Sequence, residues 1–347
     1  MSSGVLAEPL DVIGIFPSWG PGSIGGIQRS GRETWEAIVG RVGEQRARVI
    51  CYEPGTSKVR TVLKAMKTGG QPRLVLVWHI DLLKLLPFLN LTASRVVLFL
   101  HGVEAWRRHD WVTQRLLNKV DLALTNTDHT WAQFLEINPG FAKLPHRTVH
   151  LGLGARLCTA SPRPTSRPAA LMISRLDARQ DYKGHRQMIA AWPLVRERVP
   201  DAELWIAGGG DLRPHLETLV LQRQLGDSVR FLGQVSDDDK DRLMAECRCF
   251  AMPSQGDGFG LVYLEAMRMG RPCLVSNLDA GREVVNPPEG GLAVDPHTAN
   301  DIAEAMQSLL SQGAEWDRRS CLARTRYESR FTGDHFRQRL TSVLFES

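Results

Sequence analysis

Short apolar runs rich in β-branched residues alternate with longer helical patterns along the whole chain. Runs that lack a two-residue alternation of apolar and polar positions are typical of strands buried on both faces, as in parallel sheets covered by helices. The strands predicted in the first half are Val12–Phe16, Ala47–Tyr52, Leu74–His79, Val96–Leu100, Leu122–Thr125 and Thr148–Leu151. Those predicted in the second half are Ala170–Ile173, Glu203–Ala207, Val229–Leu232, Cys249–Met252 and Pro272–Ser276.

Two of the intervening helices have clear ends. One is predicted over Arg186–Val199, because Pro200 stops the pattern, and another begins after Ser236 with three acids in its first turn. The alternation of strands and helices predicts an α/β protein made of doubly wound, Rossmann-like parallel sheets.

A Pro- and Ser-rich segment at residues 158–168 separates the two series of strands and has the composition of a linker. It divides the chain into a domain of residues 1–160 and a domain of residues 161–347, with the last helix able to pack back on the first domain. Ligands bind at the carboxyl ends of the strands in such sheets, so the cleft between the two domains is the expected site.

The bulk composition fits two globular domains. The chain has 347 residues, of which 43% are apolar and 23% charged, and this excludes a disordered, collagen-like or coiled-coil protein. No stretch has the roughly 18 uncharged apolar residues of a membrane helix, and no basic segment precedes the first apolar run as in a secretory signal. The six cysteines lack zinc-like spacing, and Cys247 and Cys249 are expected to be buried thiols in a reducing compartment.

The charge is unevenly divided along the chain. Residues 1–150 carry 18 Lys and Arg against 12 Asp and Glu, whereas the remainder carries 25 against 26. The positive field of the first half favours an anionic partner such as a phosphorylated substrate, an anionic lipid surface or nucleic acid. No nucleic-acid-binding module is found, so nucleic acid is not expected.

A glycine-rich loop follows the first predicted strand. Gly20–Gly25 matches the G-x-G-x-x-G fingerprint of dinucleotide-binding proteins, with Glu53 at the end of the second strand. Pro21 inside the tight turn and the polar opening of the next helix disfavour NAD binding. The loop is interpreted instead as backbone that an anionic ligand approaches closely, or as a flexible connector.

The largest group of candidate ligand-binding residues follows the fourth predicted strand of the second domain. Residues 253–267 hold a glycine-rich loop and then a helix that begins near Leu261. The free amides at a helix start, together with the helix dipole, form a seat for a phosphate group. Asp257 lies on the loop and Glu265 eight residues later on the helix, so the two carboxylates can meet opposite ends of one ligand and accept hydrogen bonds from sugar hydroxyls.

A second polar cluster, Ser174–Gly184, follows the first strand of the same domain. Arg175 and Lys183 could both reach one edge of the sheet, where two cations would neutralise a diphosphate without a metal ion. The alternative is that both are solvated surface cations.

The order of these motifs resembles that of the family-4 retaining glycosyltransferases, which have the GT-B fold of two Rossmann-like domains facing each other across a cleft. In the second domain the resemblance covers nearly every strand and loop and rests on Arg175-Leu, Lys183-Gly, Gly208–Gly210, Asp257–Glu265, Gly281–Val285 and Gly291–Pro296. In the first domain it is limited to Gly25-Gly26 and to His101-Gly102 at a strand end.

The resemblance implies how a nucleotide-sugar donor is held. Arg175 and Lys183 would bind the donor diphosphate together with the backbone amides of Leu261 and Val262, and Glu265 would bind the ribose hydroxyls. The donor sugar would contact the loop made of Asp257, Gly258, Phe259 and Gly260.

The resemblance also implies a contribution from the first domain. His101 would line the reaction centre near the sugar and the acceptor, although a histidine at a strand end can also be a satisfied core residue. Gly25 and Gly26 would close over the diphosphate. The implied catalytic residues are therefore His101, Asp257, Arg175 and Lys183.

Asp257 departs from the family, which usually has glutamate at this position. Aspartate is one methylene shorter, a loss of reach of about 1.5 Å. The sugar contact must then be made through a shifted loop, through water, or not at all, and the donor sugar stays open.

Three consecutive acids, Asp237–Asp239, superficially match the Asp-x-Asp pair with which some unrelated glycosyltransferases bind a divalent ion. These acids open a predicted helix, where N-cap chemistry accounts for them. We expect neither a metal ion nor another cofactor.

A helix predicted within residues 58–67 has a basic, amphipathic pattern: Val59, Val62, Leu63 and Met66 share a stripe. The first interpretation is a stripe that faces the core, and the second is a surface that docks on an anionic membrane. Aromatic and basic residues within 101–111 could stack on an acceptor sugar or simply pack. In family members that build lipid-linked glycans, the first domain faces the membrane and the acceptor.

The sequence thus predicts a metal-independent, retaining hexosyltransferase. It would move a sugar from a nucleotide-diphosphate donor, first a UDP-sugar and second GDP-mannose, to a glycan or lipid-linked glycan acceptor in polysaccharide or lipopolysaccharide assembly. We expect it in the cytoplasm, with peripheral binding to the inner face of the membrane as an option. The alternatives are an epimerase or phosphorylase of the same fold, an NAD(P)-dependent oxidoreductase, and a sugar-nucleotide sensor.

Overall fold

The computed structural model describes residues 11–19, 25–52, 57–67, 70–154, 164–165 and 167–346. The chain divides into two compact units: unit 1 takes in residues 1–154 and 333–347, and unit 2 takes in residues 155–332. Each unit has one six-stranded sheet in which all pairs of strands are parallel. The expected domain boundary at residues 160 and 161, and most of the 158–168 linker, lie outside the described residues.

The sheet of unit 1 has the strand order β2-β1-β3-β4-β5-β6. Its strands are β1 (Val12–Pro17), β2 (Ala47–Tyr52), β3 (Leu74–Val77), β4 (Arg95–Leu100), β5 (Leu122–Thr125) and β6 (His146–Thr148). The chain moves outward from β1 to β2 and then crosses back to β3. The strand order therefore reverses between β1 and β3, and such a switch point is where open α/β sheets bind ligands.

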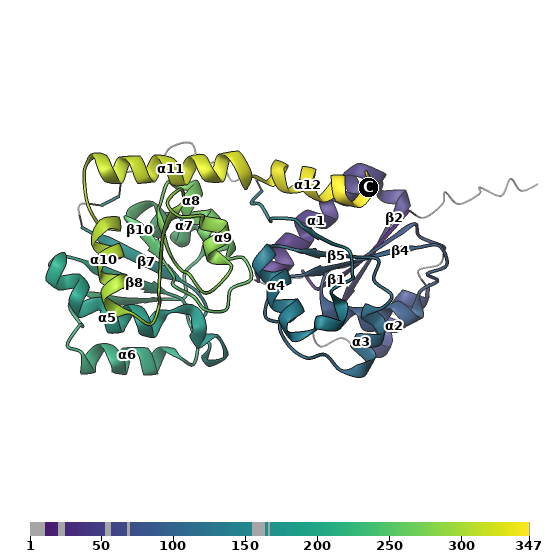
Figure 1. The fold of residues 1–347 in the computed structure, drawn as a ribbon, viewed down its shortest axis with the longest axis horizontal. Helices are drawn as coiled ribbons and strands as arrows, with labels where there is room; N and C mark the ends of the chain where they lie inside the picture. Colours follow the sequence, from purple (N-terminus) through teal and green to yellow (C-terminus); the bar gives the residue numbers. More distant parts are fainter. Residues whose placement is uncertain are drawn as a thin grey trace, which may run out of the picture. The chain divides into compact units, whose positions relative to one another are not determined.

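Helices cover both faces of this sheet. The elements are α1 (Gly26–Val42), η1 (Glu44–Arg46), α2 (Lys58–Lys67), η2 (Ile80–Phe88), α3 (Trp111–Leu117), α4 (Asp128–Ile137), η3 (Pro139–Phe141) and α12 (Gly333–Phe345). The last helix, α12, packs beside α1 (Figure 1). One core cluster joins Ile13 and Leu98 of the strands to Ala65 of α2, Leu83 of η2 and Phe134 of α4, so these helices share one face.

The sheet of unit 2 has the order β12-β11-β10-β7-β8-β9, which is the Rossmann order with its switch point between β7 and β10. Its strands are β7 (Ala169–Ile173), β8 (Glu203–Ala207), β9 (Val229–Gly233), β10 (Cys249–Ala251), β11 (Cys273–Ser276) and β12 (Gly291–Val294). The helices are η4 (Ala178–Lys183), α5 (His185–Arg198), α6 (Arg213–Gln222), α7 (Asp237–Glu246), α8 (Leu261–Arg268), α9 (Gly281–Val285), α10 (Ala299–Leu309) and α11 (Ala314–Arg330). Helices α5 and α6 lie on one side of the sheet and α8, α9 and α11 on the other (Figure 1).

The predicted fold class, two Rossmann-like parallel sheets, is confirmed. Two strand predictions need correction. The edge strand β6 covers His146–Thr148 rather than Thr148–Leu151, and β12 was not predicted at all. Cys247 and Cys249 are buried free thiols as expected, but Cys247 ends α7 and is not part of a strand.

The helix cap predicted at Ser236 is confirmed. Its side chain accepts a hydrogen bond from the backbone amide of Asp239 over 3.1 Å, and the three acids occupy the first turn of α7, where the helix dipole favours negative charge. Within the described residues, no group of three or more His, Cys, Asp and Glu side chains is arranged to hold a metal ion. No helix in the described part of the chain is both long and apolar enough to cross a membrane.

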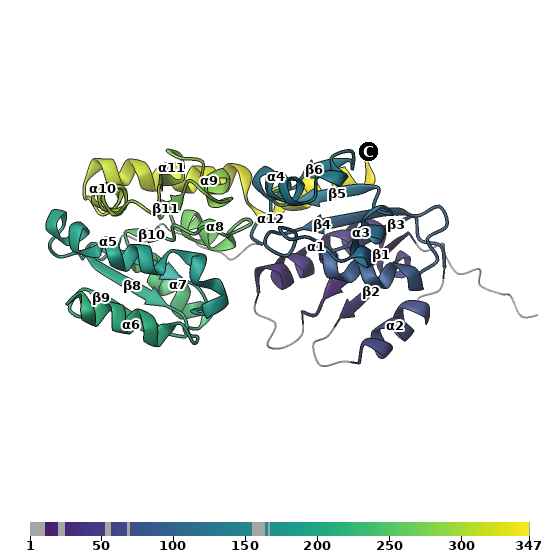
Figure 2. The same cartoon turned by 60° about the horizontal axis from the view of Figure 1, so that its bottom comes forward.

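The first interpretation of the amphipathic helix, a stripe that faces the core, is wrong. Helix α2 buries Thr61 and Ala65, whereas Val59, Leu63 and Met66 are 65%, 49% and 62% exposed. Figure 2 shows α2 at the outer edge of unit 1, next to β2. Of the predicted stripe, only Val62 packs against the core, and its other three members face solvent together with exposed basic side chains at Arg60, Lys64 and Lys67.

Candidate active site

The loops that follow β7 and β10 meet at the switch point of unit 2. Gly184, which ends the first loop in a left-handed conformation, lies so close to the second loop that a Cβ atom there would be 2.7 Å from the Pro253 carbonyl oxygen. The Gln255 amide donates to the Tyr182 carbonyl over 2.9 Å. Glycine is required at Gly184 for both reasons, and the two polar clusters found in the sequence therefore form one surface.

Lys183 and Asp257 form an ion pair at this surface. The Lys183 Nζ donates to Asp257 Oδ1, and the two side chains are only 14% and 12% exposed. Burial lowers the pKa of Lys183, but the negative charges of Asp257 and Asp279 and the nearby Tyr182 raise it more, so the pKa is above its usual range. Lys183 is thus a fixed positive charge in a partly dry environment, where charge interactions are stronger than in water.

Asp279, in the turn after β11, lies beneath this pair and is 3% exposed. Its Oδ2 accepts from the Asp257 amide over 3.1 Å, and its Oδ1 accepts from the Gly281 amide over 2.9 Å. Burial and the charge of Asp257 raise the pKa of Asp279 to about 7. No sequence motif had pointed to this residue.

The start of α8 lies directly after the Asp257 loop. Gly260 precedes the helix with φ of 79°, and no side chain caps the helix start. Leu261 and Val262, which provide the first amides, are half-buried. Uncapped amides at the positive end of a helix dipole favour an anion. Phe259 is buried against Phe331, with ring centroids 6.2 Å apart, which anchors the loop.

Glu265 lies one turn further along α8 and pairs with a lysine of α7. Lys240 Nζ is 2.9 Å from Glu265 Oε1 and 3.3 Å from Asp237 Oδ1, and the Lys240 and Glu265 side chains are 14% and 10% exposed. Lys240 was not identified from the sequence, because its partner Glu265 lies on another helix, 25 residues further along the chain. The ion pair orients the nearly buried Glu265 carboxylate.

Arg175 follows β7 and is exposed. Burial raises the pKa of Tyr182, and the positive charges of Lys183 and Arg175 oppose this shift. The backbone here is held by β8, since a Cβ at Gly208 would be 1.8 Å from the Ser174 carbonyl oxygen. The structure therefore brings Lys183 and the 257–262 loop together in unit 2, with Glu265 one turn further along α8, whereas Arg175 is an exposed side chain on the loop after β7.

His101 ends β4 in unit 1 and is 6% exposed. Its Nε2 is 2.7 Å from the Trp78 carbonyl oxygen, which only accepts hydrogen bonds, so Nε2 carries the proton and Nδ1 has the lone pair. Phe99 stacks on the ring at 4.7 Å. Burial lowers the pKa of His101 to about 3, so the ring is neutral at every physiological pH.

The two glycines expected to approach the diphosphate start α1 of unit 1. Gly25 is the N-cap residue and Gly26 the first residue of the helix, with no side-chain cap. The rest of the glycine loop, residues 20–24, and Glu53 lie outside the described residues. The geometry expected for a dinucleotide fingerprint is therefore not described.

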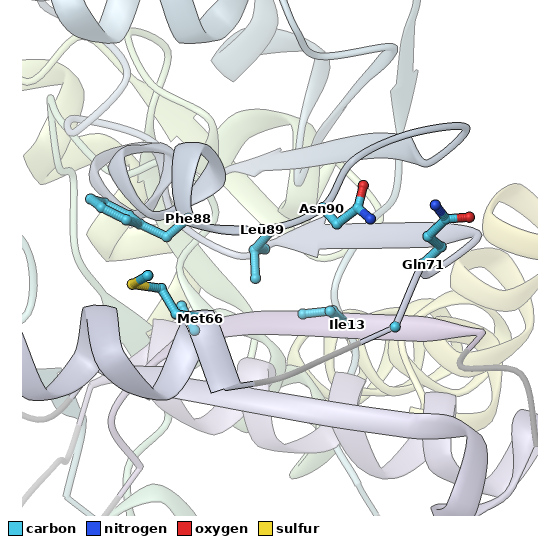
Figure 3. Close-up of a pocket in the computed structure, with 8 residues that line it drawn as sticks. Ile13, Met66, Gln71, Phe88, Leu89 and Asn90 are labelled. Carbon is cyan, nitrogen blue, oxygen red and sulfur yellow. The ribbon is translucent and has the colours of Figure 1, made fainter. Parts of the chain in front are cut away.

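A separate pocket of about 330 Å³ opens at the amino edge of the unit 1 sheet (Figure 3). Met66 of α2 and Phe88 at the end of η2 lie at one end, and Gln71 and Asn90 lie at the other. His101 ends β4 at the opposite, carboxyl edge of the sheet, so the pocket is not part of the surface around that residue.

Residues 167–312 match the family model of the group 1 glycosyl transferases. Among curated proteins, the chain is 29% identical to the glycogen synthase of Mycobacterium tuberculosis over 246 residues, which are 67% of this chain and 58% of that protein. It is 36% identical over 154 residues to the GDP-mannose-dependent alpha-(1-6)-phosphatidylinositol monomannoside mannosyltransferase of the same organism, covering 42% of this chain and 38% of the relative. The chain thus spans less than two thirds of either relative.

Solved structures resemble the chain over nearly its whole length. Sucrose-phosphate synthase from Thermosynechococcus elongatus has a TM-score of 0.76 at 19% identity and covers 96% of this chain and 98% of its own. HepE of Anabaena in complex with UDP has a TM-score of 0.76 at 17% identity, covering 97% and 100%. At these identities the likeness shows a shared fold.

Proposed function

Because residues 167–312 match the family model of the group 1 glycosyl transferases, we propose that the protein transfers a sugar from a nucleotide-diphosphate donor to a hydroxyl group of a glycan or lipid-linked glycan. The observation that carries the proposal is the meeting of Lys183, Asp257 and the uncapped start of α8 at the switch point of unit 2. This arrangement offers positive charge and free amides on one side and a carboxylate on the other.

The positive side of this surface suits a diphosphate. When the bond between the anomeric carbon and the diphosphate oxygen breaks, negative charge grows on the leaving group. Lys183, Arg175 and the amides of Leu261 and Val262 would stabilise that charge without reorganising, and such preorganised stabilisation is usually the largest contribution to catalysis. The aromatic ring of Tyr182, 5.3 Å from the Lys183 Nζ, helps to hold the cation in place.

The carboxylates suit the two ends of the donor that bear hydroxyls. Glu265, oriented by Lys240, would accept hydrogen bonds from the ribose, and the loop of Asp257, Gly258, Phe259 and Gly260 would contact the sugar. Gly25 and Gly26 would add backbone amides from unit 1. We further propose transfer with retention and without a metal ion: the acceptor oxygen attacks the anomeric carbon from the face that the diphosphate leaves, and a phosphate oxygen takes the acceptor proton.

His101 would serve as a hydrogen-bond acceptor rather than as an acid. Its Nδ1 lone pair can receive a hydrogen bond from a sugar hydroxyl, whereas its low pKa prevents it from donating a proton from a charged ring. This role matches a neutral hydroxyl of the donor sugar or of the acceptor.

For the donor, we propose a UDP-sugar first and GDP-mannose second. HepE, which shares the fold, has been crystallised with UDP-glucose, whereas one relative is named as GDP-mannose-dependent.

A thermal-shift panel of UDP, GDP, ADP and their sugars tests this choice of donor, because a ligand that binds only the folded state raises the unfolding temperature. We expect UDP or GDP compounds to stabilise the wild type but not Lys183→Ala. Incubating the stabilising donor alone and then with acceptor separates transfer from epimerisation.

We also propose that unit 1 docks on an anionic membrane surface through α2. The helix places exposed Val59, Leu63 and Met66 beside the exposed cations Arg60, Lys64 and Lys67, and its sequence contains no acid. Apolar side chains that insert into the headgroup region, together with basic ones that contact anionic lipids, are typical of interfacial helices. This arrangement would bring a lipid-linked acceptor to the enzyme in the cytoplasm, at the inner face of the membrane.

A further inference from the structure

The Asp257 loop is held by one buried carboxylate that the donor does not need to touch. Asp279 accepts a hydrogen bond from the Asp257 amide through Oδ2 and one from the Gly281 amide through Oδ1. The Ala280 amide in turn donates to the Asp257 carbonyl over 3.3 Å. The turn after β11 and the loop after β10 are therefore bonded in both directions at a single residue, Asp257.

The same carboxylate reaches a second point of the loop. The Ser254 side chain hydrogen-bonds to Asp279, and the Ser254 hydroxyl also accepts from the Gly256 amide over 3.3 Å. Three residues of the segment that begins at Ser254 are thus fixed by Asp279, directly or through one hydroxyl. Burying a carboxylate is costly unless such donors satisfy it, so Asp279 is a strong tether only while these contacts are made.

The hydrogen bonds to the Asp257 backbone determine which groups its short carboxylate can reach. One of its oxygens, Oδ1, binds Lys183, while Oδ2 is buried and has no hydrogen-bond partner among the described residues. A buried carboxylate oxygen without a donor is unfavourable in the free protein and is satisfied when a ligand hydroxyl arrives. A backbone shift at Asp257 would move both oxygens, because aspartate has only one rotatable methylene between its backbone and its carboxylate.

We propose that Asp279 is a positioning residue for transfer: by bonding the Asp257 backbone, it sets this aspartate so that Oδ1 holds Lys183 and Oδ2 receives a hydroxyl of the donor sugar. The inference rests on the proposed glycosyltransferase function and explains how aspartate serves where the family has a longer acid. Asp279 itself does not contact the reacting atoms.

The proposal implies a pH dependence of kcat. The charged groups that face Asp279 are Asp257 from the β10 loop and Lys183 from η4, and the tyrosines Tyr182 of η4 and Tyr263 of α8 also lie near enough for its charge to raise their pKa values. A protonated Asp279 cannot accept at both oxygens as a carboxylate does. Because its pKa is about 7, kcat falls as the pH drops through 7 and the bond to the Asp257 amide is lost.

The test uses the full-length protein with three variants. Asp279→Ala removes both acceptors, Asp279→Asn keeps one carbonyl oxygen without the titration, and Asp295→Ala is the matched control. Asp295 also follows a strand of unit 2 and accepts a turn hydrogen bond, from the His297 amide over 2.9 Å, but lies in the segment after β12. The measurements are kcat, donor KM, the Kd of the free nucleoside diphosphate, and amide exchange in residues 254–260.

We expect Asp279→Ala to lower kcat about 10- to 100-fold, as small misplacements in active sites do. The Kd of the nucleoside diphosphate should change less than about threefold, because Asp279 affects Lys183 only indirectly and leaves the α8 amides and Glu265 in place. Amide exchange at Asp257 should accelerate. Asp279→Asn should recover part of kcat and lose the inflection near pH 7, and Asp295→Ala should behave as wild type.

Three results would overturn the inference. The first is a kcat for Asp279→Ala within twofold of wild type. The second is an equal loss of kcat and of nucleoside diphosphate binding, which would indicate a general structural role. The third is unchanged amide exchange at Asp257. Failure of the proposed function looks different: the wild type would then transfer no sugar from any donor, while amide exchange would still report the tether.

Discussion

The carboxyl edges of the two parallel sheets are built from opposite kinds of side chain. In unit 2 the edge at the switch point is ionic and consists of Lys183 with Asp257, Lys240 with Glu265, and Asp279. In unit 1 the side chain at the end of β4 is His101, which is neutral and enclosed by the aromatic rings of Phe99 and Trp78. The two sheets have related topology, so the difference lies in the side chains that the loops present.

This difference indicates a division of labour. An edge of paired charges can exchange one partner for an anionic ligand and respond to charge that develops on it. A neutral, buried ring offers only a hydrogen bond and suits an uncharged hydroxyl. We therefore propose that unit 2 binds the donor diphosphate and that unit 1 binds the hydroxyl-bearing part of the reaction. Each prediction below removes one feature of this contrast.

The largest expected effect follows from removing the central cation of the ionic edge. Lys183→Ala should lower transfer by about 100-fold or more, the range seen when one preorganised donor at a developing charge is removed. It also leaves the buried Asp257 without its cation. Steady-state rates with saturating donor measure the effect, and Lys119→Ala, an exposed lysine of unit 1, is the control. Equal rates for the two variants would remove the distinction between the edges.

A smaller effect is expected at the ribose end of the ionic edge. Glu265→Gln keeps the shape of the side chain but loses the charge that Lys240 pairs with, at 2.9 Å. The donor KM should rise roughly tenfold, which corresponds to one charged hydrogen bond. Lys240→Ala should raise KM in the same direction by less. If KM were unchanged in both variants while kcat fell, the ribose assignment would be wrong.

At the neutral edge of unit 1, we expect His101 to contribute no pH dependence to kcat. His101→Ala should lower kcat about tenfold through loss of one hydrogen bond. In the wild type, however, His101 should give no inflection in kcat between pH 5 and pH 9, because its pKa is about 3. An inflection near pH 6.5 that disappears in His101→Ala would show that the ring titrates and would contradict the neutral assignment.

The same histidine predicts the sign of a stability change. Unfolded histidine has a pKa near 6.5, and folding lowers it to about 3. Between these values the unfolded chain binds the extra proton, so the stabilising contribution rises with pH through this window and is lost as the pH falls. Urea unfolding at pH 5 and pH 7 should therefore differ less in His101→Gln than in wild type.

The smallest expected effect on transfer lies outside both edges, on α2. Leu63→Asp puts a negative charge on the exposed apolar stripe, where Leu63 is 49% exposed and contributes little to the fold. Transfer to a water-soluble acceptor should change less than about twofold, whereas sedimentation with vesicles containing anionic lipid should be lost. Leu221→Asp, an exposed leucine on α6, is the control. Equal vesicle binding by both variants would contradict the docking proposal.

The sequence predicted the fold best where strands are buried on both faces. The runs Leu122–Thr125 and Glu203–Ala207 coincide with β5 and β8, because a short, mostly apolar run is typical of a strand buried on both faces. Prediction failed at two of the four edge strands, whereas the edge strands β2 and β9 were predicted. The edge strand β6 is polar, and β12 begins at a glycine and is partly exposed, so neither has the apolar signal on which the prediction depends.

Only the parts of the candidate site that follow from the order of strands and loops along the chain were predictable. The loops after β7 and β10 were identified, and they meet because both flank the switch point. Lys240 and Asp279 were missed, since their contacts depend on how α7 and the turn after β11 pack against α8 and the β10 loop. The orientation of α2 was also unpredictable, because an amphipathic pattern shows that a stripe exists but not what it faces.

A crystal structure of the protein with the nucleoside diphosphate that stabilises it most tests the central claim directly. We expect phosphate oxygens within hydrogen-bonding distance of the Lys183 Nζ and of the Leu261 and Val262 amides, with the ribose hydroxyls on Glu265. A diphosphate bound elsewhere, with Lys183 still paired only to Asp257, would contradict it.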